Sequence, residues 1–242
     1  MSESLPVTPL NENDRLVLRD RVYDAVIDLL ISGRVEPGQA LRIEHLANLL
    51  DVSPTPVREA LAKIEATGLV TRVAQKGYRV APLLAAAQMS ELIDAREMLE
   101  LGAMELISGE LDTLVPKLVT AQQRHEAAAQ RFAELAPDDP ATLVVLREYF
   151  DADWSFHLAI LRHPGNRYVL QMAEGLGGHL HRRRQGVVVG VNDTQHAVRE
   201  HAAILAEFEK GDLRAAIEAM RVHMEQIRHR SMKDLSAQPP GR

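Results

Sequence analysis

Apolar residues recur at helical spacing through most of this chain, and they define its predicted elements. A first helix is predicted from the apolar positions Leu18, Val22, Val26 and Leu29. A short amphipathic helix is predicted over 43–50, and a third helix starts after the brief turn Asp51-Val52. The third helix has one apolar face, which consists of Val57, Ala60, Leu61 and Ile64. Two helices joined by so short a turn have the spacing of a helix-turn-helix.

The start of the third helix favours a role in reading DNA. Ser53 suits the N-cap position, where its hydroxyl can accept from a free amide of the first turn. Pro54 and Pro56 fall within that turn, where a missing N–H costs nothing. Thr55 and Arg58 lie on the polar side of the helix, free to enter a major groove. The alternative is an ordinary capped helix in a helical bundle.

A basic hairpin is predicted directly after this helix. Residues 69–80 suit two short strands joined by a turn at 75–77, and Arg72, Lys76 and Arg79 lie on them without any acidic residue. Such a hairpin can act as a wing whose positive charges meet DNA phosphates. The expected DNA contacts are therefore Arg42, Ser53, Thr55, Arg58, Arg72, Lys76 and Gly77.

The remainder of the chain is predicted to be a helical bundle. Breaks near 109, 136–140, 163–166, 186–193 and 211–212 divide it into six helices, and its first helix has a predicted buried stripe at Leu92, Ile93, Met98, Leu99 and Met104. The connections are so short that neighbouring helices must pack antiparallel. The predicted fold class is mainly α, with an N-terminal winged helix-turn-helix followed by a six-helix antiparallel bundle. The expected boundaries are a disordered 1–13, a reading domain over 14–82, a linker over 83–88, the bundle over 89–235 and a disordered tail over 236–242.

Charge and composition refine this picture only slightly. The 242 residues carry a formal net charge of −6, which by itself argues against nucleic acid. Residues 14–81, however, hold ten Lys/Arg against nine Asp/Glu, a net of +1, so clustered positive side chains can still face a groove. The chain has no cysteine, no apolar run of the ~18 residues that a membrane span needs and no signal-peptide core. A cytoplasmic protein without membrane contact is expected.

Four residues of the predicted bundle have the spacing of a metal site. Asp153 and His157 are four residues apart, which places both on one helix face. His201 and His223 flank Gly211-Asp212, a pair that suits the end of one helix and the start of the next. His201 lies ten residues before the glycine and His223 eleven after the aspartate, so both stand at the same height in a helical hairpin. A third helix facing the hairpin would bring all four side chains to one point.

Three imidazoles and a carboxylate suit Zn²⁺, Ni²⁺, Mn²⁺, Fe²⁺ or Cu²⁺, and they leave one or two coordination positions open. One divalent ion per chain is expected, with Zn²⁺ ahead of Ni²⁺ and Mn²⁺. The alternative for any single histidine is an ordinary core or surface side chain, and four others are expected at the surface, namely His45, His125, His163 and His229. An open metal near cationic side chains suits a small carboxylate, which an arginine can bind bidentately. Candidates for this contact are Arg96, His179, Arg182 and Arg183, although the run 181–184 could also be a solvated helix end.

Two stretches resemble known families. The first stretch contains Pro37-Gly38, Leu46-Ala47, Ser53-x-x-Pro56-Val57-Arg58-Glu59-Ala60-Leu61, Gly68-Leu69-Val70 and Gly77-Tyr78. This series resembles the winged-helix domain of GntR-family bacterial regulators. The second stretch contains Asp153-x-x-x-His157, Glu200-His201, Gly211-Asp212 and Met220-x-x-His223. This series is similar to the FCD domain of the FadR subfamily. The metal-binding members of that subfamily hold a cation with one Asp and three His. Arg96 and Glu100 match the Arg and Glu of that domain's first helix, and the resemblance adds Glu100 to the effector candidates. The acyl-CoA binder of the subfamily lacks the metal pattern, which argues against acyl-CoA here.

The resulting hypothesis is a homodimeric, metabolite-responsive regulator, most simply a repressor. Its dimer would read a palindromic operator, and a small carboxylate on the metal would change DNA affinity. Two alternatives remain. One is a metalloenzyme acting on a small organic acid, and the other is a regulator whose bundle serves only dimerisation.

Overall fold

The computed structural model describes residues 12–32, 34–108, 111–136, 139, 141–189 and 194–236. The chain forms two compact units, whose main boundary lies between Ala81 and Pro82. Residues 1–11 and 237–242 of the segments expected to be disordered lie outside the described residues, as do 190–193 of the expected break at 186–193. Residues 186–189 of that break are helical, contrary to the prediction. Glu12, Asn13 and Ser236, which the sequence assigns to those disordered ends, are helical.

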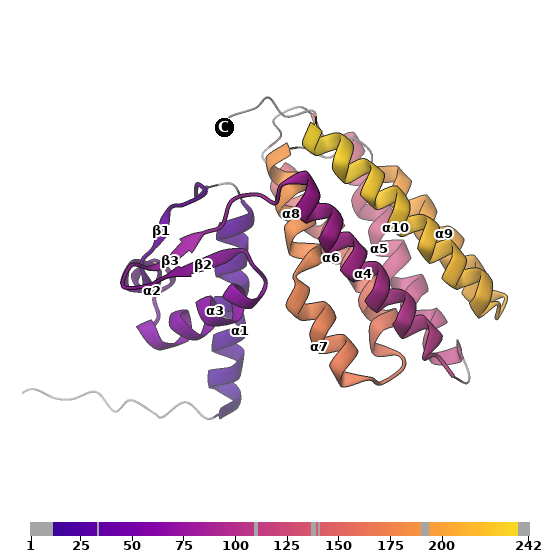
Figure 1. Ribbon diagram of the computed structural model, residues 1–242, viewed down its shortest axis with the longest axis horizontal. Helices are drawn as coiled ribbons and strands as arrows, with labels where there is room; N and C mark the ends of the chain where they lie inside the picture. Colours follow the sequence, from indigo (N-terminus) through magenta and orange to yellow (C-terminus); the bar gives the residue numbers. More distant parts are fainter. Residues whose placement is uncertain are drawn as a thin grey trace, which may run out of the picture. The chain divides into compact units, whose positions relative to one another are not determined.

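The first unit has the predicted winged helix-turn-helix (Figure 1). Its elements are α1 (Glu12–Ile31), β1 (Ala40–Leu41), α2 (Ile43–Leu50), α3 (Pro54–Ala66), β2 (Val70–Val73) and β3 (Gly77–Val80). The sheet is antiparallel with the order β1-β3-β2, so the predicted hairpin gains a short third strand. Val57, Ala60, Leu61 and Ile64 of α3 are all buried, which leaves the opposite face of this helix in solvent.

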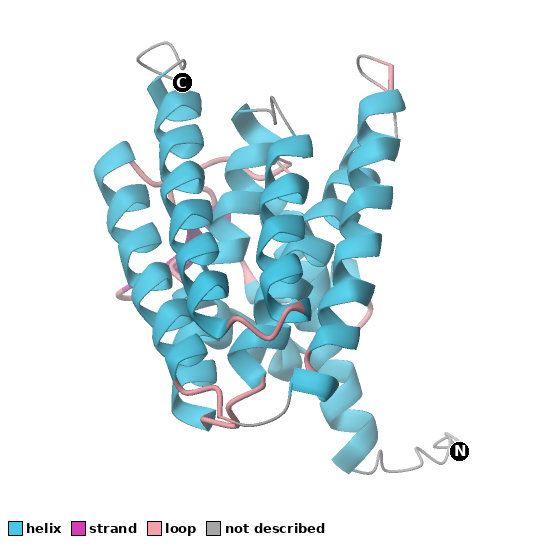
Figure 2. Ribbon diagram, turned by 90° about the vertical axis from the view of Figure 1, so that its right-hand side faces the viewer, coloured by secondary structure: helices cyan, strands magenta, loops and turns pink. Residues whose placement is uncertain are grey.

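The second unit is a bundle whose helices run side by side (Figures 1 and 2). Its described residues form α4 (Ala86–Glu105), the 3₁₀ turn η1 (Leu111–Thr113), α5 (Val115–Glu134), α6 (Thr142–Arg162), α7 (Arg167–Leu176), α8 (Gly178–Val189), α9 (Thr194–Glu209) and α10 (Leu213–Ser236). These are seven α-helices instead of the predicted six, because Gly177 adopts a left-handed conformation (φ 58°) and ends α7 before α8 begins. The predicted mainly α fold class is confirmed.

The inner face of α4 differs from the predicted stripe. Met98 is 76% exposed, whereas Arg96 and Glu100 are 4% and 2% exposed and occupy core-facing positions between Ile93 and Met104. Both charged side chains can be buried because they form an ion pair with each other. Since α4 begins at Ala86, it also takes up part of the segment 83–88 that the sequence assigns to a linker.

The core of the bundle lies among the helices that carry the four predicted metal ligands. Its largest cluster joins α4, α6, α9 and α10 through Ile93, Met104, Phe156, Ile160, Ile204, Phe208, Met220 and Met224. Within the described residues, no helix is both long and apolar enough to cross a membrane.

Candidate metal centre

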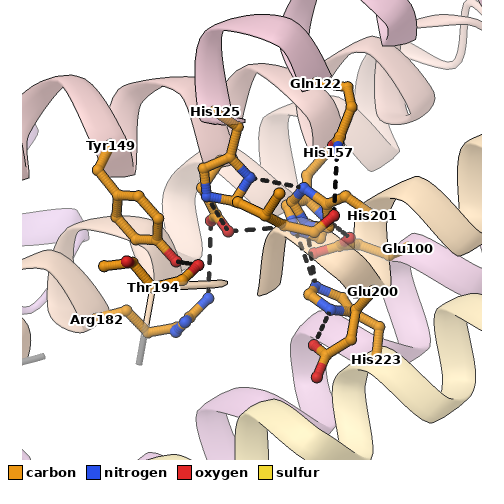
Figure 3. A network of polar contacts seen from close by, with 12 residues as sticks. Glu100, Gln122, His125, Tyr149, His157, Arg182, Thr194, Glu200, His201 and His223 are labelled. Carbon is orange, nitrogen blue, oxygen red and sulfur yellow. Dashed lines mark hydrogen bonds and ion pairs between the residues drawn. The ribbon is translucent and has the colours of Figure 1, made fainter. Parts of the chain in front are cut away.

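Three helices supply the four predicted ligands. Asp153 and His157 lie one turn apart on α6, and His201 and His223 lie on α9 and α10. The hairpin between α9 and α10 forms as the sequence suggests, because Gly211 adopts a positive φ of 75° and the Asp212 carboxylate accepts from the Ala215 amide at 2.9 Å. His157, His201 and His223 are completely buried, and their rings face one another (Figure 3).

The ring nitrogens converge at the spacing of metal ligands. His223 Nε2 lies 3.3 Å from His157 Nε2 and 3.3 Å from His201 Nε2. Ligand atoms about 2.1 Å from a tetrahedral zinc ion stand about 3.4 Å apart, so these nitrogens need little movement to share one ion. Asp153 Oδ1 lies 3.7 Å from His201 Nε2, is buried, and accepts no hydrogen bond from the described residues. It is therefore available to a cation.

The tautomers of two histidines follow from their partners. The Nδ1 atoms of His157 and His223 each face a carboxylate oxygen, Glu100 Oε2 for His157 and Glu200 Oε2 for His223, the latter at 2.8 Å. Since a carboxylate can only accept, each Nδ1 carries a proton, and in the neutral imidazole each Nε2 then presents a lone pair. Two such lone pairs 3.3 Å apart in a buried site repel each other. A cation placed between them would be coordinated by both nitrogens, which removes the repulsion.

Each of these carboxylates is in turn held by an arginine. Arg96 donates to Glu100 Oε1 from Nε at 3.1 Å and from Nη2 at 2.9 Å. Arg230 donates from both terminal nitrogens to Glu200, one of them at 2.8 Å. The result is two Arg–Glu–His chains, which orient their imidazoles and make them better ligands.

The pKa values of the site residues favour the binding of a cation. Burial lowers the pKa of His223 to about 4, and burial together with His223 and His157 lowers the pKa of His201 well below its ordinary value. Burial alone would raise the pKa of Asp153, but Arg182 and His157 hold it well below the ordinary value. At neutral pH His201 and His223 are therefore neutral and Asp153 is anionic, which are the forms in which these side chains bind divalent transition metals.

His125 corrects the prediction that it lies at the surface. It is completely buried on α5, with Nδ1 3.2 Å from His201 Nδ1 and Nε2 4.0 Å from Asp153 Oδ1. The signal was present in the sequence, because His125 continues the helical stripe of Leu118, Ala121 and Ala128. Of the other histidines expected at the surface, His45 and His229 are exposed and His163 is half-buried.

The predicted effector residues do not share one environment. Arg96 and Glu100 bind each other, His179 stacks on Trp154 with ring centroids 4.1 Å apart, and Arg183 lies 3.5 Å from Asp151. Arg182 differs from these, because it lies 3.7 Å from Asp153 Oδ2 and lines a cavity of about 410 Å³. That cavity also has Tyr149, His196, His229, Arg230 and Lys233 in its wall.

The first unit exposes most of its predicted DNA contacts. Thr55, Arg58, Arg42, Arg72 and Lys76 have exposed side chains, and Gly77 adopts a positive φ of 75° at the end of the hairpin turn. Ser53 occupies the N-cap position of α3, but its side chain makes no capping hydrogen bond there, contrary to the prediction. Its exposed hydroxyl is thus not used within the helix. The guanidinium of Arg79, a residue predicted to meet phosphates, donates to the Gly38 carbonyl at 2.7 Å.

Comparisons with known proteins match both units. The model of bacterial regulatory proteins of the gntR family matches residues 18–80, and that of the FCD domain matches 91–226. An uncharacterised HTH-type transcriptional regulator of an unstable DNA locus in Streptomyces ambofaciens is 30% identical over 89% of this chain and 85% of its own. The HTH-type transcriptional repressor GlaR of Escherichia coli is 30% identical over 81% of this chain and 87% of its own.

Solved structures show the same fold. A GntR transcriptional regulator from Rhodococcus sp. RHA1 superposes with a TM-score of 0.66 at 20% identity, covering 92% of this chain and all of its own. E. coli McbR/YncC superposes with a TM-score of 0.68 at 18% identity, covering 89% and 97%.

Proposed function

The chain belongs to the GntR family of bacterial transcription regulators and carries an FCD domain, and from this premise we propose that a divalent metal ion and a small carboxylate together control its binding to DNA. The family and the relatives are transcription regulators, not enzymes, so the metalloenzyme alternative is dropped. Some relatives are named repressors, which supports repression as the simplest mode.

The proposed operator contacts come from α3 and the hairpin. Thr55 and Arg58 project from the exposed face of α3, and Lys76 lies at the hairpin turn. Readout by two such units requires a homodimer and a palindromic operator. A dimer is supported by exposed apolar side chains on two helices that pack against each other, because Met98 of α4 is 76% exposed and Tyr168 and Met172 of α7 are 70% and 52% exposed.

The observation that carries the metal proposal is the convergence of the Nε2 atoms of His157, His201 and His223 in the core of the bundle. His157, His201 and His223, whose ligand atoms lie within 4.8 Å of one another, would hold one ion through Nε2. Asp153, which forms a second such group with His125 and His201, would complete the set through Oδ1. Zn²⁺ suits this donor set best, with Ni²⁺ and Mn²⁺ as alternatives. When bound, the ion would offer open coordination positions to the oxygens of an anionic ligand.

The cavity beside Arg182 supports an anionic effector. Arg182 Nη1 is buried without a hydrogen-bond partner among the described residues, although its charge lies near Asp153. A carboxylate reaching the metal centre from the cavity would give this nitrogen an acceptor and would share its charge. Arg230 in the same wall is paired with Glu200, and Lys233 lies beside Asp234, so the Nη1 of Arg182 that lacks a hydrogen-bond partner among the described residues is the feature that favours an acid over a neutral sugar. A volume of about 410 Å³ suits a small organic acid.

One helix offers a route from this pocket to the start of the bundle. Arg182 of α8 lies near Asp153, and two residues later Arg184 donates from Nη1 to the Pro82 carbonyl at 3.3 Å. Pro82 is the first residue of the second unit after the reading unit. An effector that moves Arg182 would thus move the attachment point of the reading unit. For this to regulate, the effector must bind the two conformations with unequal affinity.

The test measures metal content, effector binding and operator binding in one series. The purified protein should hold close to one divalent ion per chain, and the His201→Ala/His223→Ala double variant should hold none while remaining helical. Small carboxylates such as lactate, citrate and sugar acids should then be screened through Trp154 fluorescence, because this residue adjoins Asp153.

The acid that changes the fluorescence should also change operator affinity, and only in the metal-loaded protein. A stoichiometric metal retained by the double variant would refute the metal site. An acid that acts equally on the metal-free protein would refute the mechanism. A bundle that binds neither metal nor acid would serve dimerisation alone.

A further inference from the structure

Gly178 allows Arg96 to pass directly over the first turn of α8. A Cβ atom built on Gly178 would lie 2.5 Å from Arg96 Cδ, 3.0 Å from Cγ and 3.4 Å from Nε. Carbon atoms that are not bonded pack at about 3.5–4.0 Å, so a methyl group here overlaps the arginine severely. The overlap is with the middle of the side chain, and a simple rotation of its tip cannot remove it.

Arg96 has little freedom to give way. Its side chain is buried, and Nε and Nη2 are both bonded to Glu100 Oε1. The neighbouring cavity, lined by Arg96, Glu100, Trp154 and Gly178, has a volume of only about 10 Å³. That is about the space of one water molecule, less than a displaced guanidinium needs. Any shift of Arg96 therefore strains its two hydrogen bonds to Glu100.

The strain continues to the metal centre, because Glu100 Oε2 binds His157 Nδ1 and so sets the orientation of that ring. We propose that Gly178 is a positioning residue for the metal centre, which it affects only through Arg96, Glu100 and His157. This inference rests on the proposed function, since it assumes that His157 is a metal ligand. It gives a reason for a glycine in the first turn of α8, where no positive φ requires one.

The variant Gly178→Ala should bind Zn²⁺ about 10-fold more weakly than the natural protein, the lower end of the cost of disturbing outer-shell partners. Affinity is measured by competition with a chromophoric chelator, and the Co²⁺ absorption spectrum reports the ligand geometry. Gly175→Ala on α7 and Gly102→Ala on α4 are matched controls, because a Cβ at either position meets no atom within 4 Å. Both should bind Zn²⁺ like the natural protein.

A double-mutant cycle separates this role from general destabilisation. Arg96→Ala removes the side chain that a methyl at Gly178 would strike, and should itself weaken Zn²⁺ binding. Gly178→Ala added to Arg96→Ala should then cost nothing further, and its Co²⁺ spectrum should match that of Arg96→Ala alone. Should Gly178→Ala alone misfold, the double variant should still fold and bind.

The outcomes distinguish the two proposals. A natural protein that binds no Zn²⁺ overturns the proposed function, and this inference with it. Natural Zn²⁺ binding with an unchanged Gly178→Ala variant overturns the positioning role alone. Losses that add in the double variant, or a double variant that fails to fold although Arg96→Ala alone folds, also overturn it, because Gly178 would then act independently of Arg96.

Discussion

Replacement of Glu200 by glutamine tests whether the outer carboxylates set metal affinity. Glu200 accepts from His223 Nδ1 at 2.8 Å and from both terminal nitrogens of Arg230. Burial would raise its pKa, but the hydrogen bonds from Arg230 and His223 lower the pKa to about 2. The side chain is thus ionised at neutral pH, and Glu200→Gln removes a full negative charge while nearly preserving shape.

The expected loss is 10- to 100-fold in Zn²⁺ affinity, which is about 1.4–2.8 kcal/mol. A hydrogen bond to a charged group contributes about 1.5–3 kcal/mol. Loss of the charge that strengthens the hydrogen bond from His223 to Glu200 therefore accounts for the expected loss of Zn²⁺ affinity. Zn²⁺ affinity is measured at pH 7 by chelator competition, with Glu209→Gln as a control, because Glu209 is exposed on the same helix. Unchanged affinity in Glu200→Gln, or an equal loss in Glu209→Gln, would refute the reasoning.

Arg58→Ala should cost about 1–3 kcal/mol of specific operator binding if the side chain contacts a guanine, measured by titration of operator and scrambled DNA. Lys76→Ala should instead weaken both DNAs alike and reduce the salt slope by about one unit. Arg184→Ala should bind metal and acid normally but transmit less of the acid's effect to operator affinity, because the Pro82 carbonyl loses its donor. The stability of the metal-free protein should fall as pH drops from about 6.5 towards 4, since the folded pKa of His223 is about 4 against 6.5 unfolded and the unfolded state takes up the proton first. Urea unfolding at pH 7 and pH 5 checks this, and equal stabilities would contradict it.

The spacing of residues along the sequence was sufficient to predict the structure where local backbone geometry determines it. The proline-rich start of α3 and the apolar face from Val57 to Ile64 define a helix that needs no distant partner to begin or to orient. Gly211 and Asp212 each have one strongly preferred role at a helix boundary, so the height of His201 and His223 in the hairpin followed from counting residues.

Spacing failed where a polar group takes a core position by pairing with a distant one. A stripe of apolar residues assigned Met98 to the core of α4, yet Arg96 and Glu100 are buried because they bind each other and His157. The same kind of partnership buries His125, whose contacts lie on α6 and α9. The contacts of Glu100 and His125 with other helices are set by tertiary structure. The i, i+4 spacing of Arg96 and Glu100 is visible within one helix, but it does not show that the pair is buried.

The two Arg–Glu–His chains differ in what they connect. The chain of Arg230, Glu200 and His223 lies within the α9–α10 hairpin. The chain of Arg96 and Glu100 lies on α4, which begins at Ala86, close behind Pro82. The α8 helix reaches Pro82 as well, through Arg184. A change at His157 or Asp153 thus has two short routes to the start of the second unit, and α10, which carries His223, contacts the beginning of α4 through Arg228 and Ser90. Both halves of the site thus have contacts that lead to the start of the second unit.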